Sequence, residues 1–148
     1  MRTIFAIFAL VGWMLCGTAT GQECEQTIEG NDLLQFSLAE IRVSGSCEQV
    51  TIALQHVGSL PANVMGHNWV LTTTANYMTV ATAGQAAGPP GYMPDGDPRV
   101  IANTDLIGGG ESSSVTFNLS GLEPGGDYTY FCTFPGHYVL MKGKFIIE

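Results

Sequence analysis

The chain has 148 residues, with 13 acidic and 5 basic side chains and a formal charge of −8. Such a charge excludes a binder of nucleic-acid phosphates, which needs clustered lysine and arginine, and an anionic membrane surface as the main partner. A hydrophobic content of 45% is enough for a folded core, so intrinsic disorder is excluded as well. Only 3 histidines are present, which is too few for a large multi-metal oxidase centre.

The first 21 residues have the pattern of a cleaved secretory signal peptide. Arg2 precedes an apolar run over residues 4–15, and small residues follow up to Gly21, where the polar part of the chain begins. We expect cleavage after Gly21, with Thr20 and Gln22 as the flanking alternatives. The alternative of a membrane anchor is disfavoured, because an apolar run of about 12 residues is shorter than the roughly 20 that a spanning helix needs.

Residues 22–148 are then expected to form a single domain with a formal charge of −9, because Arg2 is lost with the signal. Three cysteines remain in this part of the chain: Cys24, Cys47 and Cys132. Export places them in an oxidising compartment, where thiols tend to pair. An odd number therefore leaves at least one cysteine for another task.

The exported part of the chain has the sequence pattern of an all-β protein. Short segments with alternating or β-branched apolar residues are separated by clusters of Gly, Pro, Asn and Ser, which is typical of an antiparallel sandwich or barrel. A turn is expected at residues 29–32. The expected strands cover residues 34–42, 50–54, 69–73, 115–119, 128–132 and 144–147.

One segment departs from this rhythm. Residues 75–87 are rich in Ala and have apolar residues at a spacing closer to that of a helix. The Gly-Pro-Pro-Gly run at residues 88–91 ends the pattern. We expect a short helical flap inserted between strands. No alternation of strands and helices is present, so a doubly wound nucleotide-binding sheet is disfavoured.

The residues that carry chemistry lie in two places. Cys132, His137 and Met141 follow one another with the spacing Cys-x4-His-x3-Met, and Pro135-Gly136 between them favours a tight bend. Far upstream, His67 stands beside an expected strand. Each residue alone is more often structural, a buried thiol, a satisfied imidazole or a core methionine. Together they make two imidazoles, one thiolate and one thioether, the donor set of a trigonal electron-transfer copper site.

The chain resembles the azurins, which are blue-copper proteins of the cupredoxin fold. The likeness extends over nearly all of the exported part, and the Cys-to-His-to-Met spacing distinguishes the azurins from plastocyanin-like members, in which the Cys-to-His gap is shorter. The segments that carry the resemblance are Glu23-Cys24 and residues 63–71, 99–102, 114–117, 131–137 and 140–143.

The resemblance implies a Greek-key β-sandwich or barrel of the cupredoxin type and one copper ion that cycles between Cu(II) and Cu(I). It implies His67, Cys132 and His137 as the equatorial ligands, Met141 as a long axial ligand, and the Gly66 backbone carbonyl as a weak contact on the other side. Cys24 and Cys47 occupy the disulfide positions of the family. Asn68 matches the residue that braces the ligand loops, and the backbone N–H groups of Asn68 and Phe134 are expected to donate to the Cys132 sulfur.

The third histidine, His56, matches a family histidine that lies near the copper without binding it. We expect a partly buried histidine whose ring nitrogens are satisfied by the backbone. The alternative is that protonation of His56 shifts the reduction potential with pH. A comparison of His56→Leu with the parent over about pH 5 to 9 distinguishes the two, because that range spans the ordinary imidazole titration.

The expected function is one-electron transport in the periplasm, without enzymatic activity. In azurins the C-terminal ligand histidine lies at the surface within a ring of apolar side chains, which suits brief docking of redox proteins such as c-type cytochromes or copper or haem reductases. We expect a monomer that neither binds nucleic acid nor inserts into membranes. The alternative is a copper carrier or buffer that delivers metal rather than electrons. The matching docking positions are Leu34, Leu60, Met65, Phe134, Pro135 and Leu140.

Overall fold

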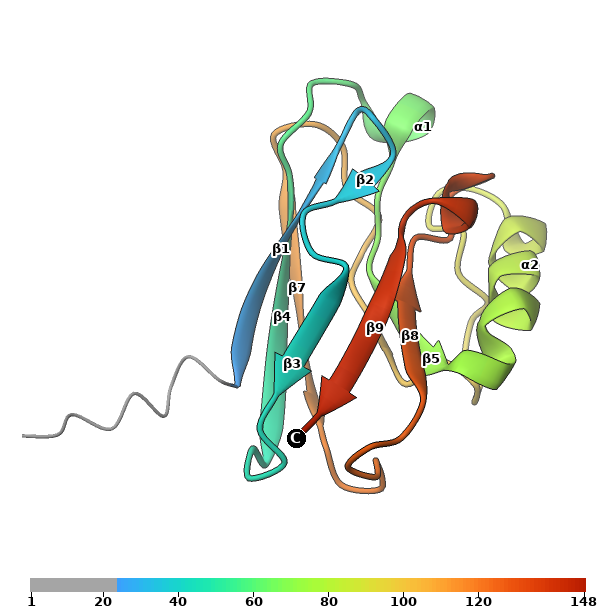
Figure 1. The fold of residues 1–148 in the computed structure, drawn as a ribbon. Helices are drawn as coiled ribbons and strands as arrows, with labels where there is room; N and C mark the ends of the chain where they lie inside the picture. The colour runs from blue at the N-terminus through green and yellow to red at the C-terminus, as the bar shows by residue number, and fades with distance from the viewer. Residues whose placement is uncertain (1–23) are drawn as a thin grey trace, which may run out of the picture.

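The computed structural model describes residues 24–148, which form two β-sheets packed face to face with a helix at one side (Figure 1). The expected signal peptide, residues 1–21, lies outside the described residues. One sheet has the order β2-β1-β4-β7, and the other has the order β3-β9-β8-β5-β6. The strands are β1 (Glu25–Asn31), β2 (Gln35–Phe36), β3 (Glu40–Val43), β4 (Gln49–His56), β5 (Val70–Thr73), β6 (Ala102–Asn103), β7 (Ser112–Asn118), β8 (Tyr128–Phe131) and β9 (Lys142–Ile147).

The expected all-β sandwich is confirmed, but its strands are not all antiparallel. β1 runs parallel to β4, and β3 runs parallel to β9. The reason is the path of the chain, which leaves the first sheet after β2, adds β3 to the second sheet and then returns with β4. A strand that re-enters a sheet after such a crossover pairs in the parallel sense. Both sheets are therefore mixed.

The core lies between the sheets and follows the two-residue period of the strands. In β4 the side chains of Val50, Ile52 and Leu54 are buried, while Thr51 and Ala53 between them are half-buried. They face Trp69 and Tyr130 of the opposite sheet, which are also fully buried. Burial of this apolar surface holds the sheets together, because each Å² removed from water stabilises the fold by about 25 cal/mol.

Two expectations for the N-terminal third were wrong. Residues 34–42 do not form one strand, because Leu34 has a positive φ of 61° and the chain changes sheets between β2 and β3. Residues 29–32, expected to be a turn, instead include the end of β1. β1 was missed because most of its residues are polar, with only Ile28 and Gly30 buried.

The expected helical flap is confirmed as α2 (Tyr77–Ala87), which follows the 3₁₀ turn η1 (Thr74–Asn76). α2 buries Val80, Ala81 and Gly84, and it stands beside the sheet that contains β5 and β8 (Figure 1). Gly88 follows with φ of 73°, a left-handed conformation that a residue without Cβ adopts readily, and this ends the helix. Two further short helices carry parts of the site: α1 (Ala62–Met65) and η2 (His137–Val139).

A disulfide joins Cys24 to Cys47, as expected. It connects the start of β1 to the turn before β4, and Cys132 is the free cysteine of the described residues. Within residues 24–148, no helix has the length and apolar character that crossing a membrane requires.

Candidate metal centre

Three buried side chains meet at one end of the sandwich. His67 follows α1 and forms an isolated bridge with Ile107, Cys132 follows β8, and His137 begins η2. A nitrogen from each histidine and the Cys132 sulfur all lie within 4.8 Å of one another. The structure therefore brings together the three residues expected as equatorial ligands, although His67 and Cys132 are far apart in the sequence.

The two ring nitrogens of His67 have different surroundings. Nε2 lies 2.9 Å from the backbone oxygen of Asn31, so this nitrogen carries the proton and donates it. Nδ1 is buried and has no hydrogen-bond partner among the described residues. Burial lowers the pKa of His67, because it disfavours the charged imidazolium. His67 therefore presents the unshared electron pair of a neutral imidazole to the interior of the site.

Cys132 and His137 complete the donor set. The Cys132 sulfur lies 3.7 Å from Nδ1 of His137, whose pKa is lowered to about 4, first by burial and then by the charges of His67 and His56. Burial raises the pKa of Cys132 to about 12, while hydrogen bonds from the backbone N–H groups of Asn68 and Phe134 oppose that rise. With so high a pKa, the thiol stays protonated at neutral pH unless a cation lies beside it, and a bound metal ion is such a cation.

Met141 packs beside Cys132 in the same part of the molecule. It is fully buried and packs in one cluster with Cys132 and Phe134. The N–H of Cys132 donates to the carbonyl of Met141 at 3.0 Å and so closes the loop that begins at Cys132 and ends at Met141. Within this loop, the N–H of Met141 donates to the carbonyl of His137 at 2.8 Å. The Gly66 carbonyl lies 3.8 Å from the Cys132 sulfur. Both residues expected as weak contacts are therefore in the site.

Asn68 joins the two halves of the site. Its Oδ1 accepts the backbone N–H of Thr133 at 2.9 Å, and its Nδ2 donates to Thr133 Oγ1 at 2.7 Å. Asn68 and Thr133 are fully buried and each is adjacent in sequence to a donor residue, His67 or Cys132. This pair of hydrogen bonds fixes the spacing between the two donors.

The ring nitrogens of His56 are hydrogen-bonded by the backbone, as expected, but the side chain is buried rather than partly buried. Its Nε2 lies 2.8 Å from the Met65 carbonyl, and its Nδ1 accepts the N–H of Gly58 at 3.1 Å. The ring stacks on that of His67, with centroids 4.2 Å apart and planes 13° from parallel. His56 therefore packs against one face of the His67 ring and supports its orientation.

Gly30 and Asn31 are functional residues that the sequence analysis missed. A Cβ on Gly30 would lie 2.7 Å from Cδ2 of His67, so only glycine allows this close approach. Asn31 contributes its backbone oxygen, which every residue type has. The one signal available in the sequence was a glycine within a segment that could pair as a strand.

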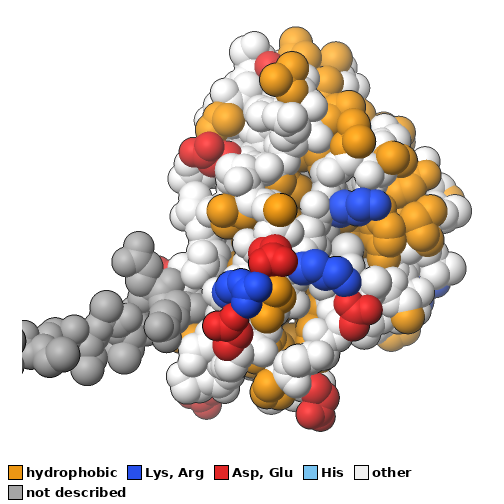
Figure 2. All heavy atoms as spheres, viewed as in Figure 1, with side chains coloured by type: hydrophobic (Ala, Val, Ile, Leu, Met, Phe, Trp, Pro, Cys, Tyr) orange, Lys and Arg blue, Asp and Glu red, His pale blue; other side chains and the backbone are white. Residues whose placement is uncertain are grey.

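The surface over the site is apolar, but the expected residues contribute unequally. Leu60, Pro135 and Leu140 are exposed and Leu34 and Met65 are half-buried, whereas Phe134 is only 8% exposed and mainly packs inward. Two neighbours in sequence, Leu33 at 73% and Val64 at 53% exposure, add surface that the sequence analysis missed. Figure 2 shows hydrophobic side chains gathered over α1 and over the region of η2 and α2.

The donor set fits copper. Two neutral imidazole nitrogens, a thiol and a thioether are the ligand types of trigonal electron-transfer copper sites. The unpartnered Nδ1 of His67 is the specific sign, because a buried polar atom without a hydrogen bond is costly unless something binds it. Hard cations such as magnesium prefer oxygen ligands, which these side chains do not offer.

Comparisons with known proteins agree with this geometry. Residues 22–148 match the model of the family described as copper binding proteins, plastocyanin/azurin family. The chain is 53% identical over 127 residues to azurin of Pseudomonas denitrificans, covering 85% of this chain and 99% of that protein. It is 55% identical over 122 residues to azurin of Achromobacter denitrificans, covering 82% of each. It is 49% identical over 136 residues to azurin of Pseudomonas aeruginosa, covering 91% of this chain and 92% of that protein. The chain therefore belongs to the plastocyanin/azurin family of copper-binding proteins.

Proposed function

We propose that this protein is a one-electron carrier that holds a single copper ion through Nδ1 of His67, the thiolate of Cys132 and Nδ1 of His137. The observation that carries the proposal is the buried, unpartnered Nδ1 of His67 in the same 4.8 Å cluster as the other two donors. The thioether of Met141 would be a further, weaker ligand, and the Gly66 carbonyl would be a weak contact. Copper, when bound, supplies the Cu(II)/Cu(I) couple.

The burial of the donors supports electron transfer rather than catalysis. His67, Cys132 and Met141 are fully buried, and His137 is 5% exposed. A catalytic metal site keeps a position open for water or substrate, whereas here all four candidate donor side chains are buried. The thiolate and thioether favour Cu(I), while neutral imidazoles suit either oxidation state. We therefore infer that the protein carries an electron and transforms no substrate.

The frame around the donors supports an exchange of electrons with little movement. Asn31 orients His67, Asn68 ties it to Thr133, and the Cys132–Met141 hydrogen bond closes the ligand loop. Groups that surround metal ligands in this way fix their orientation and tune the metal. The side chains that would hold copper are thus kept in place by bonds that do not involve the metal.

The apolar surface over His137 is the proposed docking face. Its exposed members include Leu60 and Leu140, and Asp32 accepts the N–H groups of Ser59 and Leu60, which connects the loop of Leu33 and Leu34 to that of Leu60. Small apolar faces suit brief contacts. We propose redox proteins such as c-type cytochromes or copper or haem reductases as partners, a monomeric state, and export to the periplasm after cleavage of residues 1–21.

The test is a visible spectrum of the copper(II)-loaded protein beside Cys132→Ser, with bound copper measured in both. We expect an intense blue thiolate-to-copper band in the parent that ascorbate bleaches, and no such band in Cys132→Ser. A matched control, Cys24→Ser with Cys47→Ser, removes the two disulfide cysteines and should stay blue. A colourless parent that still bound copper would overturn the proposal in favour of a copper carrier or buffer.

A further inference from the structure

One aromatic ring outside the donor set contacts the sequence neighbours of three proposed ligands. Tyr77, the first residue of α2, packs edge-to-face on Phe131, with ring centroids 5.0 Å apart. It also packs on Tyr138 at 6.4 Å, and the ammonium of Lys142 lies 5.2 Å from its ring centroid. Phe131 precedes Cys132, Tyr138 follows His137, and Lys142 follows Met141.

The hydroxyl of Tyr77 makes a hydrogen bond that the ligand loop does not make for itself. It donates to the backbone carbonyl of Tyr138. The turn around η2 uses the carbonyls of Phe134, Gly136 and His137 for its own backbone N–H groups. The next carbonyl along the chain, that of Tyr138, receives its hydrogen bond from α2. Tyr77 thus connects the loop to an element that is not part of it.

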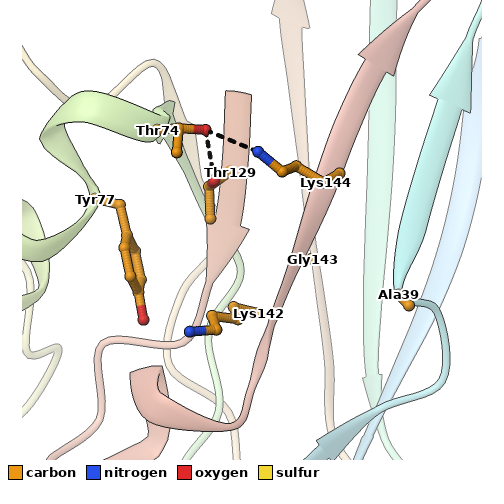
Figure 3. Close-up of a pocket in the computed structure, with 7 residues that line it drawn as sticks. All are labelled: Ala39, Thr74, Tyr77, Thr129, Lys142, Gly143 and Lys144. Carbon is orange, nitrogen blue, oxygen red and sulfur yellow. Dashed lines mark hydrogen bonds between the residues drawn. The ribbon is translucent and has the colours of Figure 1, made fainter. Parts of the chain in front are cut away.

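That element is firmly held. α2 buries Val80 and Ala81 in a cluster with Val70 and Phe131 of the sheet. Figure 3 shows the Tyr77 ring extending from the start of α2 past the amine of Lys142, as one wall of the groove between α2 and β9. The ring therefore projects from a helix that is packed against the sheet onto the loop.

We propose that Tyr77 is a positioning residue that holds the loop from Cys132 to Met141 in one conformation in both oxidation states of the copper. The inference rests on the proposed electron-carrier function. The contacts with Phe131 and Lys142 fix the two ends of the loop, and the hydroxyl fixes its middle next to His137. Without the hydroxyl, the loop moves more readily and the copper site changes more between its two states.

The test compares Tyr77→Phe, which keeps the ring, with Tyr77→Leu, which removes it. In the copper-free protein we expect the loop amides, measured by hydrogen exchange, to exchange about 5-fold faster in Tyr77→Phe, as the loss of one neutral hydrogen bond implies. In the loaded protein we expect about 10-fold faster copper release to a chelator, as for other residues that support metal ligands. Tyr77→Leu should exceed both changes, and electron self-exchange should slow in the same order.

Tyr128→Phe is the matched control. Its hydroxyl also bonds to the backbone, accepting the N–H of Glu123, but at the opposite end of β8. It should lower overall stability without selective change in the loop. If Tyr77→Phe has the loop exchange and copper release of the parent, or changes no more than Tyr128→Phe, the positioning role is overturned. Failure of the proposed function is detected separately, because the copper-loaded parent would then lack the blue band in its visible spectrum.

Discussion

His67 shows how a single residue can be prepared for a metal before one arrives. Its Nε2 proton is committed to the Asn31 carbonyl, which leaves Nδ1 deprotonated and aimed into the site. Stacking on His56 restricts rotation of the ring. The lowered pKa of His67, caused mainly by burial, keeps the ring neutral. Little rearrangement is then needed when the nitrogen binds a metal.

Outside the donor set, we expect replacement of Asn68 to lower the stability of the fold markedly. Asn68→Ala removes both hydrogen bonds to Thr133 and leaves a buried N–H without a partner. We expect a loss of about 2–4 kcal/mol in the free energy of unfolding, since an unsatisfied buried group costs about 1–3 kcal/mol and a second bond is lost as well. Urea unfolding of the copper-free protein measures it.

The control for Asn68 is Asn103→Ala, because Asn103 is exposed and its side chain makes one bond, to the Thr104 carbonyl. This change should stay within about 0.5 kcal/mol of the parent, as surface substitutions usually do. Equal effects of the two substitutions would contradict the bracing role of Asn68.

The candidate donors and the brace Asn68 could be predicted from the sequence, whereas the backbone supports of His67 could not. Cys132, His137 and Met141 lie in one loop with a distinctive spacing, and the chemistry belongs to their side chains. The support of His67 comes instead from the backbone of Asn31 and from the missing Cβ of Gly30. A backbone carbonyl is the same in every residue, so only the fold reveals which one is used.

At the scale of elements, the loop that returns the chain from α2 to the sheet is held by an ion pair. Asp97 Oδ1 accepts both the backbone N–H of Arg99, at 3.0 Å, and its Nε, at 2.8 Å. The Arg99 carbonyl in turn accepts the hydroxyl of Thr72 in β5 at 2.7 Å. The Arg99 side chain lowers the pKa of Asp97 from the usual 3.8 to about 2.

Asp97→Asn should therefore destabilise the copper-free protein in a pH-dependent way. Because the folded-state pKa is lowered, the ionised carboxylate stabilises the fold fully above about pH 4, and this contribution is lost as the pH falls through about 2. We expect a lower urea midpoint for Asp97→Asn at pH 7, with the gap closing towards pH 2. Asp95→Asn is the control, since Asp95 has no ion-pair partner within residues 24–148. A gap that stays constant with pH would contradict this assignment.

A strand or helix could be predicted from the sequence where one of its faces is buried in the core, because its apolar residues then recur at a regular spacing. β4, β7 and β9 show alternating burial, and α2 is recognisable from its composition and the glycine and prolines after it. β1 has too few buried side chains to give such a signal. Strand direction was not predictable either, because it depends on which sheet the chain enters next.

At the scale of the whole molecule, several ion pairs lie together on one part of the surface. The basic side chains Arg42 and Lys144 are paired with carboxylates of Glu40, Glu148 and Asp127. Figure 2 shows these charges interleaved over β3 and β9, away from the apolar surface over α1. A partner that docks at the apolar end therefore meets few charges.

Met65→Lys tests whether electrons pass through that end. Two copies docked face to face would bring two added ammonium groups together in an apolar contact, which costs several kcal/mol. We expect electron self-exchange to slow by at least about tenfold, equivalent to about 1.4 kcal/mol, while the visible spectrum stays nearly unchanged. Ser114→Lys, with the same charge change on the exposed side of β7, should leave the rate close to that of the parent. Equal rates in the two variants would place docking on another face.

β9 has a consequence for the synthesis of the protein. It is the last strand of the chain, yet it lies between β3 and β8, and the ligand loop leads directly into it. A chain released before β9 is complete leaves β3 and β8 without their shared neighbour and Met141 without the strand that anchors it. A nascent or truncated chain thus carries its donors without a frame to hold them. We therefore expect a chain that lacks β9 to hold copper poorly, even though its donor side chains are present.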